Sequence, residues 1–285
     1  MSAIKACVTK ACVIGHPVAH SRSPLIHKYW LAVHHIKADY TRVDVAPEDI
    51  ESFFDKFASG PYIGASVTVP HKEIAFRKVF EADAVAKALG AVNTLWHKDG
   101  RLYGASTDVH GFIANLNRSQ PRWQSQVETA LVIGAGGAAR AVVYGLLERK
   151  VQNIVVANRT VTRARELAAH FQNRITPSAL GNLRLHLREA DLLVNTTSLG
   201  MKGQPPLEID LDPLKQSAIV CDIVYAPLET DLLKAARLRG NPVVDGLGML
   251  LHQAAPAFER WFGVRPEVTP ELRALVAADL ARDAS

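Results

Sequence analysis

The stretch TALVIGAGGAARAVVYGLLER, Thr129–Arg149, contains the pattern that decides the fold of this chain. Its first five residues are mostly apolar and predict a buried strand, and an apolar helix follows the glycines. Gly134–Ala139 match the G-x-G-x-x-G/A pattern between that strand and that helix. The stretch therefore predicts a Rossmann-type strand–turn–helix unit, which binds the phosphates of a dinucleotide.

Each small residue of this turn has a physical role in such a site. Gly134 permits the tight turn, Gly136 lets backbone amides approach a pyrophosphate, and Ala139 keeps the helix close to the strand. The helix N-terminus then offers N–H groups and the positive end of its dipole to the phosphates. A tight strand–helix connection without a ligand is the alternative, but the flanking strand and helix favour binding. The residues predicted to bind the cofactor here are Gly134, Ala135, Gly136, Gly137 and Ala138.

The end of the next strand indicates which dinucleotide binds. The strand NIVVA runs into Asn158-Arg159-Thr160, and Arg163 follows one turn later. An NAD site would place a carboxylate there, about 20 residues after the glycines, to bind the ribose 2′-hydroxyl. Instead, two guanidinium groups could hold a 2′-phosphate. Ordinary surface charges are the alternative, although cations are disfavoured at a helix N-terminus. We therefore predict NADP(H) as the cofactor.

Strands and helices alternate along the chain, which predicts an α/β protein of two domains. Before residue 113 the sequence predicts parallel strands, a helix in which Ser23 is the N-cap, and a hairpin about Asp99-Gly100. A polar segment with a proline near residue 118 is typical of a boundary. The tail from Leu250 onward predicts helices that Pro256 and Pro266 interrupt.

Composition excludes several classes of function. The chain has 285 residues, 48% hydrophobic and 21% charged, and a net charge of +5 without clustered basic residues, so we expect no nucleic-acid partner. Cys7, Cys12 and Cys221 have neither metal-ligand nor disulfide spacing, and the eleven histidines have no recurring spacing, so no metal site is predicted. Lys5 and Lys10 interrupt the N-terminal apolar residues, which argues against a signal peptide, and no segment is apolar enough to span a membrane. We expect a cytoplasmic protein.

Four polar clusters in the first domain fall where predicted strands end or turns begin. The carboxyl ends of parallel strands line the crevice in which α/β proteins bind ligands. Each cluster also has a purely structural explanation, as an N-cap, a turn former or a solvated charge. The candidate residues are Ser21, Ser23, Thr68, Lys72, Asn93 and Asp108.

Together with the glycine turn, these clusters resemble the shikimate dehydrogenase family over nearly the whole chain. Nine motifs in the right order are much more specific than a Rossmann pattern alone. The matching segments are HSRSPLIH, GASVTVPHK, GAVNTL, STDVHG, GAGGAAR, NRTVTR, NTTSLGM, DIVYAP and DGLGMLLHQA.

The resemblance implies the reversible NADPH-dependent reduction of 3-dehydroshikimate to shikimate, a step of aromatic amino-acid biosynthesis. It implies a substrate-binding domain at residues 1–112, a Rossmann-type NADP-binding domain at 113–247, and C-terminal helices at 248–285 that pack back on the first domain. The implied substrate contacts are Ser21 and Ser23 to the carboxylate, Thr68, Asn93, Asp108 and Gln253 to the hydroxyls, and Tyr225 beside the ring. The implied NADP contacts are Gly134 to Ala138, Asn158, Arg159, Thr160, Arg163, Ile223 and Gly246.

The resemblance further implies that Lys72, in the turn after a strand that runs into Pro70, is the catalytic residue. Its ammonium group could donate a proton to the developing alkoxide, or the amine could accept one in the reverse direction. Asp108 would orient the ammonium and favour its charged form, whereas burial would disfavour that form. General acid/base catalysis and electrostatic stabilisation of the oxyanion are both open.

The sequence departs from the family pattern at two positions, and other readings of the chain stay open. Ser66 and Ser106 replace the usual asparagines, which puts substrate affinity in doubt more than the reaction class. The alternatives are a broader quinate/shikimate dehydrogenase, a non-catalytic NADP-binding sensor, and another two-domain NADP enzyme such as a methylene-tetrahydrofolate dehydrogenase. A homodimer is also open.

Overall fold

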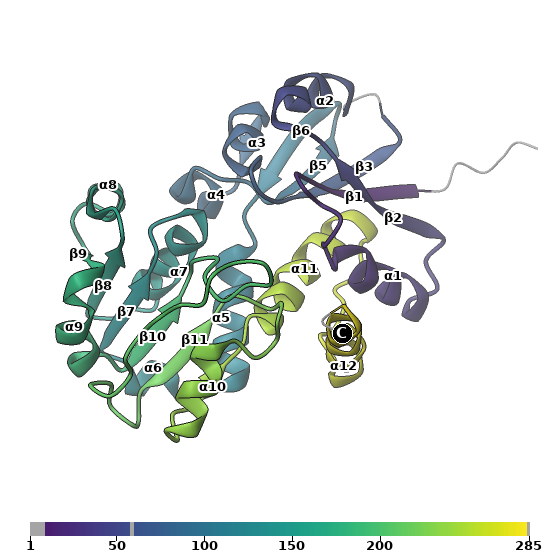
Figure 1. Cartoon of the computed structure of the whole chain (residues 1–285). Helices are drawn as coiled ribbons and strands as arrows, with labels where there is room; N and C mark the ends of the chain where they lie inside the picture. The colour runs from purple at the N-terminus through teal and green to yellow at the C-terminus, as the bar shows by residue number, and fades with distance from the viewer. Residues whose placement is uncertain (1–8, 58–59, 284–285) are drawn as a thin grey trace, which may run out of the picture. The chain divides into compact units, whose positions relative to one another are not determined.

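The computed structural model describes residues 9–57 and 60–283, which form two compact units. The first unit contains the chain up to Thr107 together with Gln253–Leu272, and the second contains Asp108–His252 and the chain from Arg273 onward. Both units are α/β, which confirms the predicted fold class (Figure 1). The C-terminal segment is divided between the units after Leu272. Arg273 belongs to the second unit, where its Nη2 donates to Asp245 Oδ2 at 2.5 Å. The functional domain limits given above stay a prediction.

The described strands of the first unit form a six-stranded mixed sheet in the order β2-β1-β3-β5-β6-β4. Strands β1, β2 and β3 pair in parallel, and β5 runs antiparallel to both β3 and β6. Asp99 and Gly100, with φ of 51° and 70°, form the turn between β5 and β6, so the predicted hairpin is confirmed. The strands are β1 (Thr9–Gly15), β2 (Ala38–Asp44), β3 (Tyr62–Val67), β4 (Glu81–Ala82), β5 (Thr94–Lys98) and β6 (Arg101–Ala105).

Short helices connect these strands. The helix after β1 begins at Ser23, with Arg22 as its N-cap and Pro24 as its second residue, so the N-cap lies one residue before the predicted position. The Ser21 hydroxyl takes over part of the capping, because it accepts a hydrogen bond from the Ser23 N–H at 3.3 Å. The helices are α1 (Ser23–Val33), the 3₁₀ helix η1 (Pro47–Asp49), α2 (Ile50–Phe57), α3 (Lys72–Lys78) and α4 (Ala84–Leu89).

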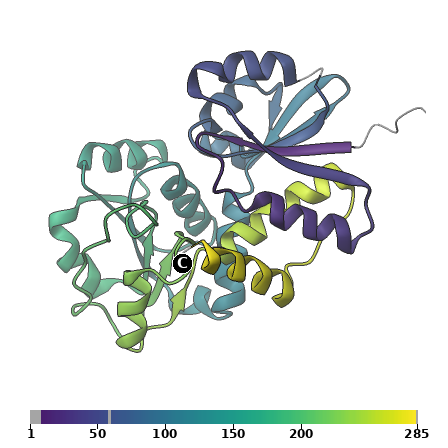
Figure 2. The same cartoon turned by 45° about the vertical axis from the view of Figure 1, so that its right-hand side comes forward.

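The C-terminal helices are α11 (Leu247–Phe262) and α12 (Pro270–Arg282). Residues of α11 from Gln253 onward pack in the first unit, where Trp261 Nε1 donates to the Leu95 carbonyl at 2.8 Å. This part of α11 lies alongside α1 (Figure 2). The predicted interruption at Pro256 is wrong, because the helix continues through it. Buried neighbours such as Phe258 hold the helix there by packing, which outweighs the one lost N–H.

An aromatic cluster between α1, β2 and α11 encloses His27 completely. The His27 ring stacks on Tyr40 with centroids 4.1 Å apart, and Trp30, Phe258 and Trp261 surround it. Neither ring nitrogen has a hydrogen-bond partner among the described residues. Burial lowers the pKa of His27 to about 3. The imidazole is therefore neutral in the folded chain throughout the ordinary pH range.

Replacing His27 with phenylalanine should make the fold less sensitive to acid. Because the folded pKa lies below the unfolded value near 6.5, the unfolded chain takes up a proton that the folded chain refuses. Stability contributed by the neutral ring is present above that unfolded value and is lost as pH falls toward 3. When the pH is lowered from 7 to 5, the free energy of unfolding of the wild-type chain should fall by about 2 kcal/mol more than that of His27→Phe. Urea unfolding at both pH values measures this, and equal losses would rule out the explanation.

The second unit contains a parallel sheet in the order β12-β11-β10-β7-β8-β9 among its described strands. Read from β9, this is the strand order 3-2-1-4-5-6 of a dinucleotide-binding fold, which confirms the prediction from the glycine turn. Figure 1 shows β9, β8, β7, β10 and β11 side by side in this order. The strands are β7 (Thr129–Ile133), β8 (Asn153–Asn158), β9 (Thr176–Ala179), β10 (Leu192–Asn195), β11 (Ile219–Asp222) and β12 (Val243–Val244).

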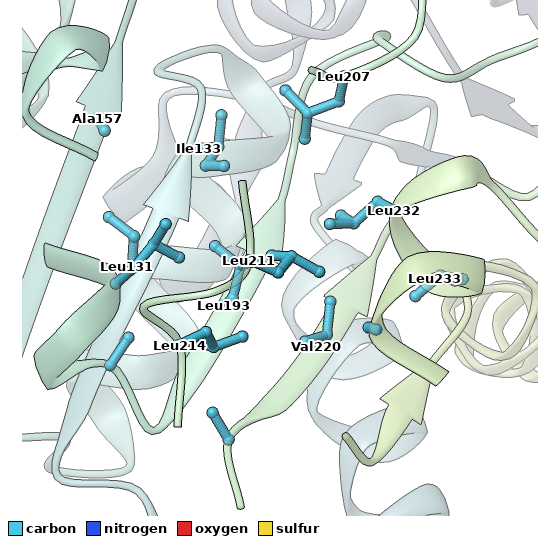
Figure 3. Close-up of a cluster of buried hydrophobic side chains, with 14 residues drawn as sticks. Leu131, Ile133, Ala157, Leu193, Leu207, Leu211, Leu214, Val220, Leu232 and Leu233 are labelled. Carbon is cyan, nitrogen blue, oxygen red and sulfur yellow. The ribbon is translucent and has the colours of Figure 1, made fainter. Parts of the chain in front are cut away.

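Helices and one large apolar cluster complete this unit. The cluster joins the sheet to α9 and α10 through side chains such as Leu131, Leu193, Val220 and Leu233 (Figure 3). No side chain in it is more than 8% exposed, so burial of apolar surface stabilises the strand order. The helices are α5 (Asp108–Ser119), α6 (Trp123–Gln126), α7 (Gly137–Glu148), α8 (Val161–His170), the 3₁₀ helix η2 (Leu180–Asn182), α9 (Leu183–Glu189) and α10 (Asp231–Leu238).

Two of the three cysteines lie in these cores. Cys12 and Cys221 are free and buried, and burial raises the pKa of both thiols. Cys7 lies outside the described residues. Within the described part of the chain, no helix has the length and apolarity that crossing a membrane requires.

Candidate functional site

Several of the polar groups that the sequence singled out follow or precede strands at one edge of the first sheet. Ile14 at the end of β1 pairs with Val67 at the end of β3. Thr94, which begins the antiparallel β5, pairs with Ser66 and with Ala105 at the end of β6. Because β5 runs in the opposite direction, its start lies at the same edge as the ends of β1, β3 and β6. Thr68 and Asn93 lie next to these positions, Lys72 lies in the turn of chain that follows Thr68, and Ser21 and Ser23 lie where the segment after β1 leads into α1.

The turn with Ser21 and Ser23 follows β1 and leads into α1. Its backbone is fixed by the Ser21 N–H, which donates to the Val18 carbonyl at 3.0 Å. Arg42 holds the other side of this turn, since its Nε and Nη2 donate to the Ser21 carbonyl at 3.0 and 2.6 Å. Both serines are partly exposed. Two hydroxyl groups are thus presented on a turn whose backbone is already constrained.

Thr68 and Lys72 follow β3. The Thr68 N–H donates to the Ile14 carbonyl at 2.9 Å, and a side chain at Gly15 would collide with Thr68, so glycine permits this close approach. Lys72 is the first residue of α3, and its carbonyl accepts from the Val92 N–H at 3.0 Å. The start of α3, where Lys72 lies, is therefore tied to the segment that precedes β5.

His71, directly before Lys72, is a residue whose role the sequence did not reveal. It is 2% exposed, and its Nε2 lies 2.7 Å from the Val45 carbonyl just beyond β2. This contact anchors the start of α3 to a second strand. The sequence contained little indication of this contact, because a histidine beside a motif is more often a surface residue.

Asn93 and Gln253 lie together, as a shared set of substrate contacts requires. Asn93 Nδ2 donates to Gln253 Oε1 at 3.4 Å and to Thr107 Oγ1 at 3.0 Å. Asn93 Oδ1 accepts from the Thr107 N–H at 2.9 Å and from the Thr94 hydroxyl at 3.0 Å. Thr107, which the sequence analysis did not select, thus fixes the orientation of the Asn93 amide. That role follows from contacts between residues 14 positions apart, just before β5 and just after β6.

The two serines that replace the usual asparagines behave differently. Ser66 Oγ accepts a hydrogen bond from the Tyr40 hydroxyl at 2.8 Å, so its position is satisfied from β2. Ser106 is 5% exposed, and its hydroxyl has no hydrogen-bond partner among the described residues, while its N–H donates to Asp83 Oδ1 at 3.4 Å. Of these two serines, only Ser106 has a buried hydroxyl without a hydrogen-bond partner among the described residues.

In the second unit, the glycine turn lies where the strand order reverses. Ile133 at the end of β7 pairs with Ala157 in β8 and with Asn195 at the end of β10. Gly134 has a φ of 106°, and a side chain there would lie 2.7 Å from Thr196 Oγ1. Both observations require glycine at this position. The end of β7 is thus the switch point at which open parallel sheets bind ligands.

This turn also fits a pyrophosphate. Gly136 is the N-cap of α7 and has no side chain to cover the N–H groups of the first helical turn. Side chains added at Gly136 or Gly137 would meet nothing within 4 Å, so both glycines border open space. A twelve-residue helix that starts at an open glycine turn suits an anionic group.

The end of β8 carries cations and no carboxylate. Asn158 Nδ2 donates to the Thr160 carbonyl at 2.8 Å, which shapes the turn into α8. Arg159 and Arg163 are both exposed next to this turn, and the first turn of α8 contains no acidic residue. Two guanidinium groups in this position suit a 2′-phosphate better than a ribose hydroxyl.

A buried carboxylate organises the loops after β10 and β11. Asp222 is 0% exposed and accepts from Asn195 Nδ2 at 3.0 Å, from the Val224 N–H at 3.0 Å and from the Thr230 hydroxyl at 2.7 Å. Burial raises the pKa of Asp222, and these hydrogen bonds oppose that effect. Asp222 therefore fixes the loop that carries Tyr225, and no motif reasoning selected it.

Gly246 lies against the same loop. A side chain at Gly246 would collide with the backbone of Ile223, so these two predicted cofactor residues are in close contact. Tyr225, in the same loop, is partly exposed.

The predicted site residues divide between the units. Lys72 belongs to the first unit, whereas Asp108 and Tyr225 belong to the second. The pairing of Lys72 with Asp108 stays a prediction. Among the described residues, no three His, Cys, Asp or Glu side chains are grouped as metal ligands.

A cofactor-binding Rossmann unit, joined to an α/β unit with a lysine and hydrogen-bonding groups at its strand ends, defines the class of two-domain nicotinamide-dependent oxidoreductases. Family models agree with this class. The shikimate dehydrogenase substrate-binding domain matches residues 13–95, shikimate/quinate 5-dehydrogenase matches 116–202, and the shikimate 5′-dehydrogenase C-terminal domain matches 246–275.

Individual proteins are similar over almost their full length. A shikimate dehydrogenase (NADP⁺) from Azorhizobium caulinodans is 57% identical over 95% of this chain and 97% of its own. Quinate dehydrogenase from Corynebacterium glutamicum, solved with NAD, has a TM-score of 0.88 at 30% identity, covering 95% and 99% of the two chains. Shikimate 5-dehydrogenase from Thermus thermophilus, solved with NADP(H) and shikimate, has a TM-score of 0.83 at 33% identity, covering 98% and 100%. The chain belongs to the shikimate dehydrogenase family.

Proposed function

We propose that the chain catalyses the reversible NADPH-dependent reduction of 3-dehydroshikimate to shikimate, a step of aromatic amino-acid biosynthesis. The 57% identity to an NADP⁺-dependent shikimate dehydrogenase over 95% of the chain carries this proposal. The NADP-type end of β8 and the polar groups at the edge of the first sheet support it independently.

NADP(H), when bound, supplies the hydride for the reaction. The second unit would hold its pyrophosphate at the start of α7 and its 2′-phosphate beside Arg159 and Arg163. Gly134 to Ala138, Asn158, Thr160, Ile223 and Gly246 would complete the cofactor site. Residues 113–247 are proposed as the cofactor-binding domain.

The first unit would hold the substrate. Ser21 and Ser23 would donate hydrogen bonds to the carboxylate, and Thr68, Asn93 and Gln253 would bind the ring hydroxyls. Asp108 would contribute to the same set, and Tyr225 would lie beside the ring. Residues 1–112 with the C-terminal helices of 248–285 are proposed as the substrate-binding domain.

Lys72 would manage the proton. Its ammonium group would protonate the oxygen that gains negative charge during reduction, and its amine would take that proton back during oxidation. Asp108 would orient the lysine and share the substrate hydroxyl. This proposal assigns proton transfer to a side chain that starts a helix and is anchored through its carbonyl.

The reaction's participants are small molecules, and we infer no nucleic-acid partner, because the basic residues are scattered along the chain. Consumption of NADPH in biosynthesis supports a cytoplasmic location. A homodimer stays a prediction that sedimentation analysis would test.

A panel of substrates and cofactors tests the proposed function. Because the chain is similar to a quinate dehydrogenase solved with NAD, quinate and NAD⁺ are the alternative substrate and cofactor to compare. We expect the absorbance of reduced nicotinamide to rise with shikimate and NADP⁺, and much more slowly with quinate or NAD⁺. Comparable rates with quinate or NAD⁺ would assign the chain to the broader quinate/shikimate group. NADP⁺ binding without any turnover would indicate a sensor instead.

Replacing Arg159 and Arg163 with alanine should weaken NADP⁺ binding selectively. Each charge-assisted hydrogen bond to a 2′-phosphate contributes about 1.5–3 kcal/mol, so the KM for NADP⁺ should rise about tenfold or more per residue. The KM for NAD⁺ should change little, because NAD⁺ lacks this phosphate. Arg165→Ala, an exposed arginine of the same helix, is the matched control. Parallel increases for both cofactors would show that these arginines do not bind the 2′-phosphate.

A further inference from the structure

His71 is held both through its backbone and through its ring. Its N–H donates to the Thr68 carbonyl at 3.0 Å, and its carbonyl accepts from the Ala75 N–H at 2.9 Å, so the residue closes the turn after β3 and opens α3. The residue is 2% exposed, and its ring Nε2 lies 2.7 Å from the Val45 carbonyl. Because a carbonyl oxygen can only accept, Nε2 carries a hydrogen and donates it. This hydrogen bond fixes the orientation of the imidazole.

The acceptor of this hydrogen bond is itself fixed. Val45 is 5% exposed, and its N–H donates to the Gly15 carbonyl at the end of β1 at 3.1 Å. The preceding carbonyl, that of Ile14, accepts from the Thr68 N–H at 2.9 Å. The His71 ring therefore closes a circle of contacts that joins β1, the segment after β2 and the turn after β3. The ring contact is the member of this circle that a side-chain substitution can remove, because the other bonds named here join backbone groups.

Lys72 follows His71 directly, so the two residues share a peptide unit. A peptide unit is planar and rigid, and a shift of the His71 backbone therefore moves the Lys72 Cα with it. On its other side, the Lys72 carbonyl accepts from the Val92 N–H at 3.0 Å. A group that transfers a proton must lie within hydrogen-bond distance of the reacting oxygen, and a misplacement of about 1 Å can lower the rate about 100-fold. The anchoring of His71 thus bears on the chemical step.

We propose that His71 is a positioning residue, whose hydrogen bond to the Val45 carbonyl sets the point from which Lys72 reaches the substrate oxygen. The inference rests on the proposed function, in which Lys72 transfers the proton. His71 needs no contact with the substrate for this role, since the Nε2 hydrogen is donated to Val45. Its loss should slow proton transfer and leave substrate and cofactor binding largely unchanged, because the other proposed contacts belong to other residues.

Two carboxamide substitutions test the role of the hydrogen bond. The amide nitrogen of glutamine can take about the place of the ring Nε2, whereas the shorter asparagine ends near the place of Nδ1 and cannot reach the Val45 carbonyl. We expect His71→Asn to lower kcat and the single-turnover rate for shikimate oxidation roughly 10–100-fold. The KM values for shikimate and NADP⁺ should stay within about threefold. His71→Gln should restore most of the rate.

A double-mutant cycle with Lys72→Ala shows whether His71 acts through the lysine. If it does, His71→Asn should lower the residual rate of Lys72→Ala by no more than about twofold, because the group that it positions is already absent. A merely structural disturbance of the site would lower the rate by a similar factor in both backgrounds.

His186→Asn is the matched control. His186 belongs to the second unit, and its Nε2 lies 2.8 Å from Ser178 Oγ, so this substitution also removes a short hydrogen bond of a histidine ring. It should leave kcat unchanged. If His71→Asn fails to fold, His71→Met takes its place with the same expected rates, since methionine fills the space of the ring and cannot donate. Thermal unfolding of each variant verifies that it is folded at the assay temperature.

The outcomes separate the failure of this inference from that of the proposed function. With an active wild-type enzyme, a rate within about twofold in the asparagine or methionine variant would overturn the inference alone. An equal loss in His71→Gln, or an equal loss in the Lys72→Ala background, would also overturn it. Absence of shikimate turnover by the wild-type enzyme would overturn the proposed function and this inference with it.

Discussion

Lys72→Ala should lower kcat for shikimate oxidation by roughly 10²–10⁴-fold, the usual contribution of a positioned general acid or base. The KM for shikimate should change much less, because the proposed carboxylate and hydroxyl contacts lie on other residues. Lys72 starts α3, and its carbonyl is bonded to the Val92 N–H, so alanine at this position keeps the local backbone. Steady-state kinetics with saturating NADP⁺ measure the effect.

Lys78→Ala provides the control for this experiment. Lys78 ends the same helix and pairs with Glu51 at the surface, where an ion pair contributes little. Its removal should leave kcat unchanged. Near-normal turnover in Lys72→Ala would refute the assignment of the proton-transfer residue, and equal losses in both variants would point to a disturbed helix.

Asp222→Ala should lower the free energy of unfolding by about 3 kcal/mol or more. The substitution removes the common acceptor of Asn195, Val224 and Thr230 and leaves three buried donors without their partner. Since these bonds hold the loop that carries Tyr225, activity should fall together with stability. Chemical denaturation and the kinetics of the same preparation measure both effects.

Asp212→Ala is the matched control for that variant. Asp212 belongs to the same unit, but its side chain is 84% exposed and pairs with Arg239 at the surface. Removing the Asp212 carboxylate should lower the free energy of unfolding by less than about 1 kcal/mol. A similar small cost for Asp222→Ala would mean that water replaces the carboxylate, and that the buried network is not what stabilises the loop.

Features that depend on neighbours in the sequence could be predicted. The turn at Gly134 is local, because one strand, one helix and a positive φ determine it. The hairpin at Asp99-Gly100 is local in the same way. The placement of Thr68 and Lys72 at a strand end followed from the strand pattern. Only the N-cap of α1 was displaced by one residue, because the Ser21 side chain bonds to the Ser23 N–H.

Features that depend on distant residues could not be predicted. The Tyr40–Ser66 hydrogen bond joins residues 26 positions apart, and nothing in either strand pattern specifies which side chains meet. Asp222 appeared as part of a motif, but its donors come both from the end of β10, at Asn195, and from the segment after β11, at Val224 and Thr230. Pro256 was expected to break a helix that packing keeps intact. In each case tertiary contacts decide the outcome.

The most direct test of the proposed activity is the reductive reaction itself. Purified protein is mixed with 3-dehydroshikimate and NADPH, the loss of reduced nicotinamide is followed, and the product is identified by chromatography. We predict oxidation of one NADPH for each shikimate formed, with far slower consumption of NADH. Binding of NADPH without its oxidation, or oxidation that yields no shikimate, would contradict the proposed function.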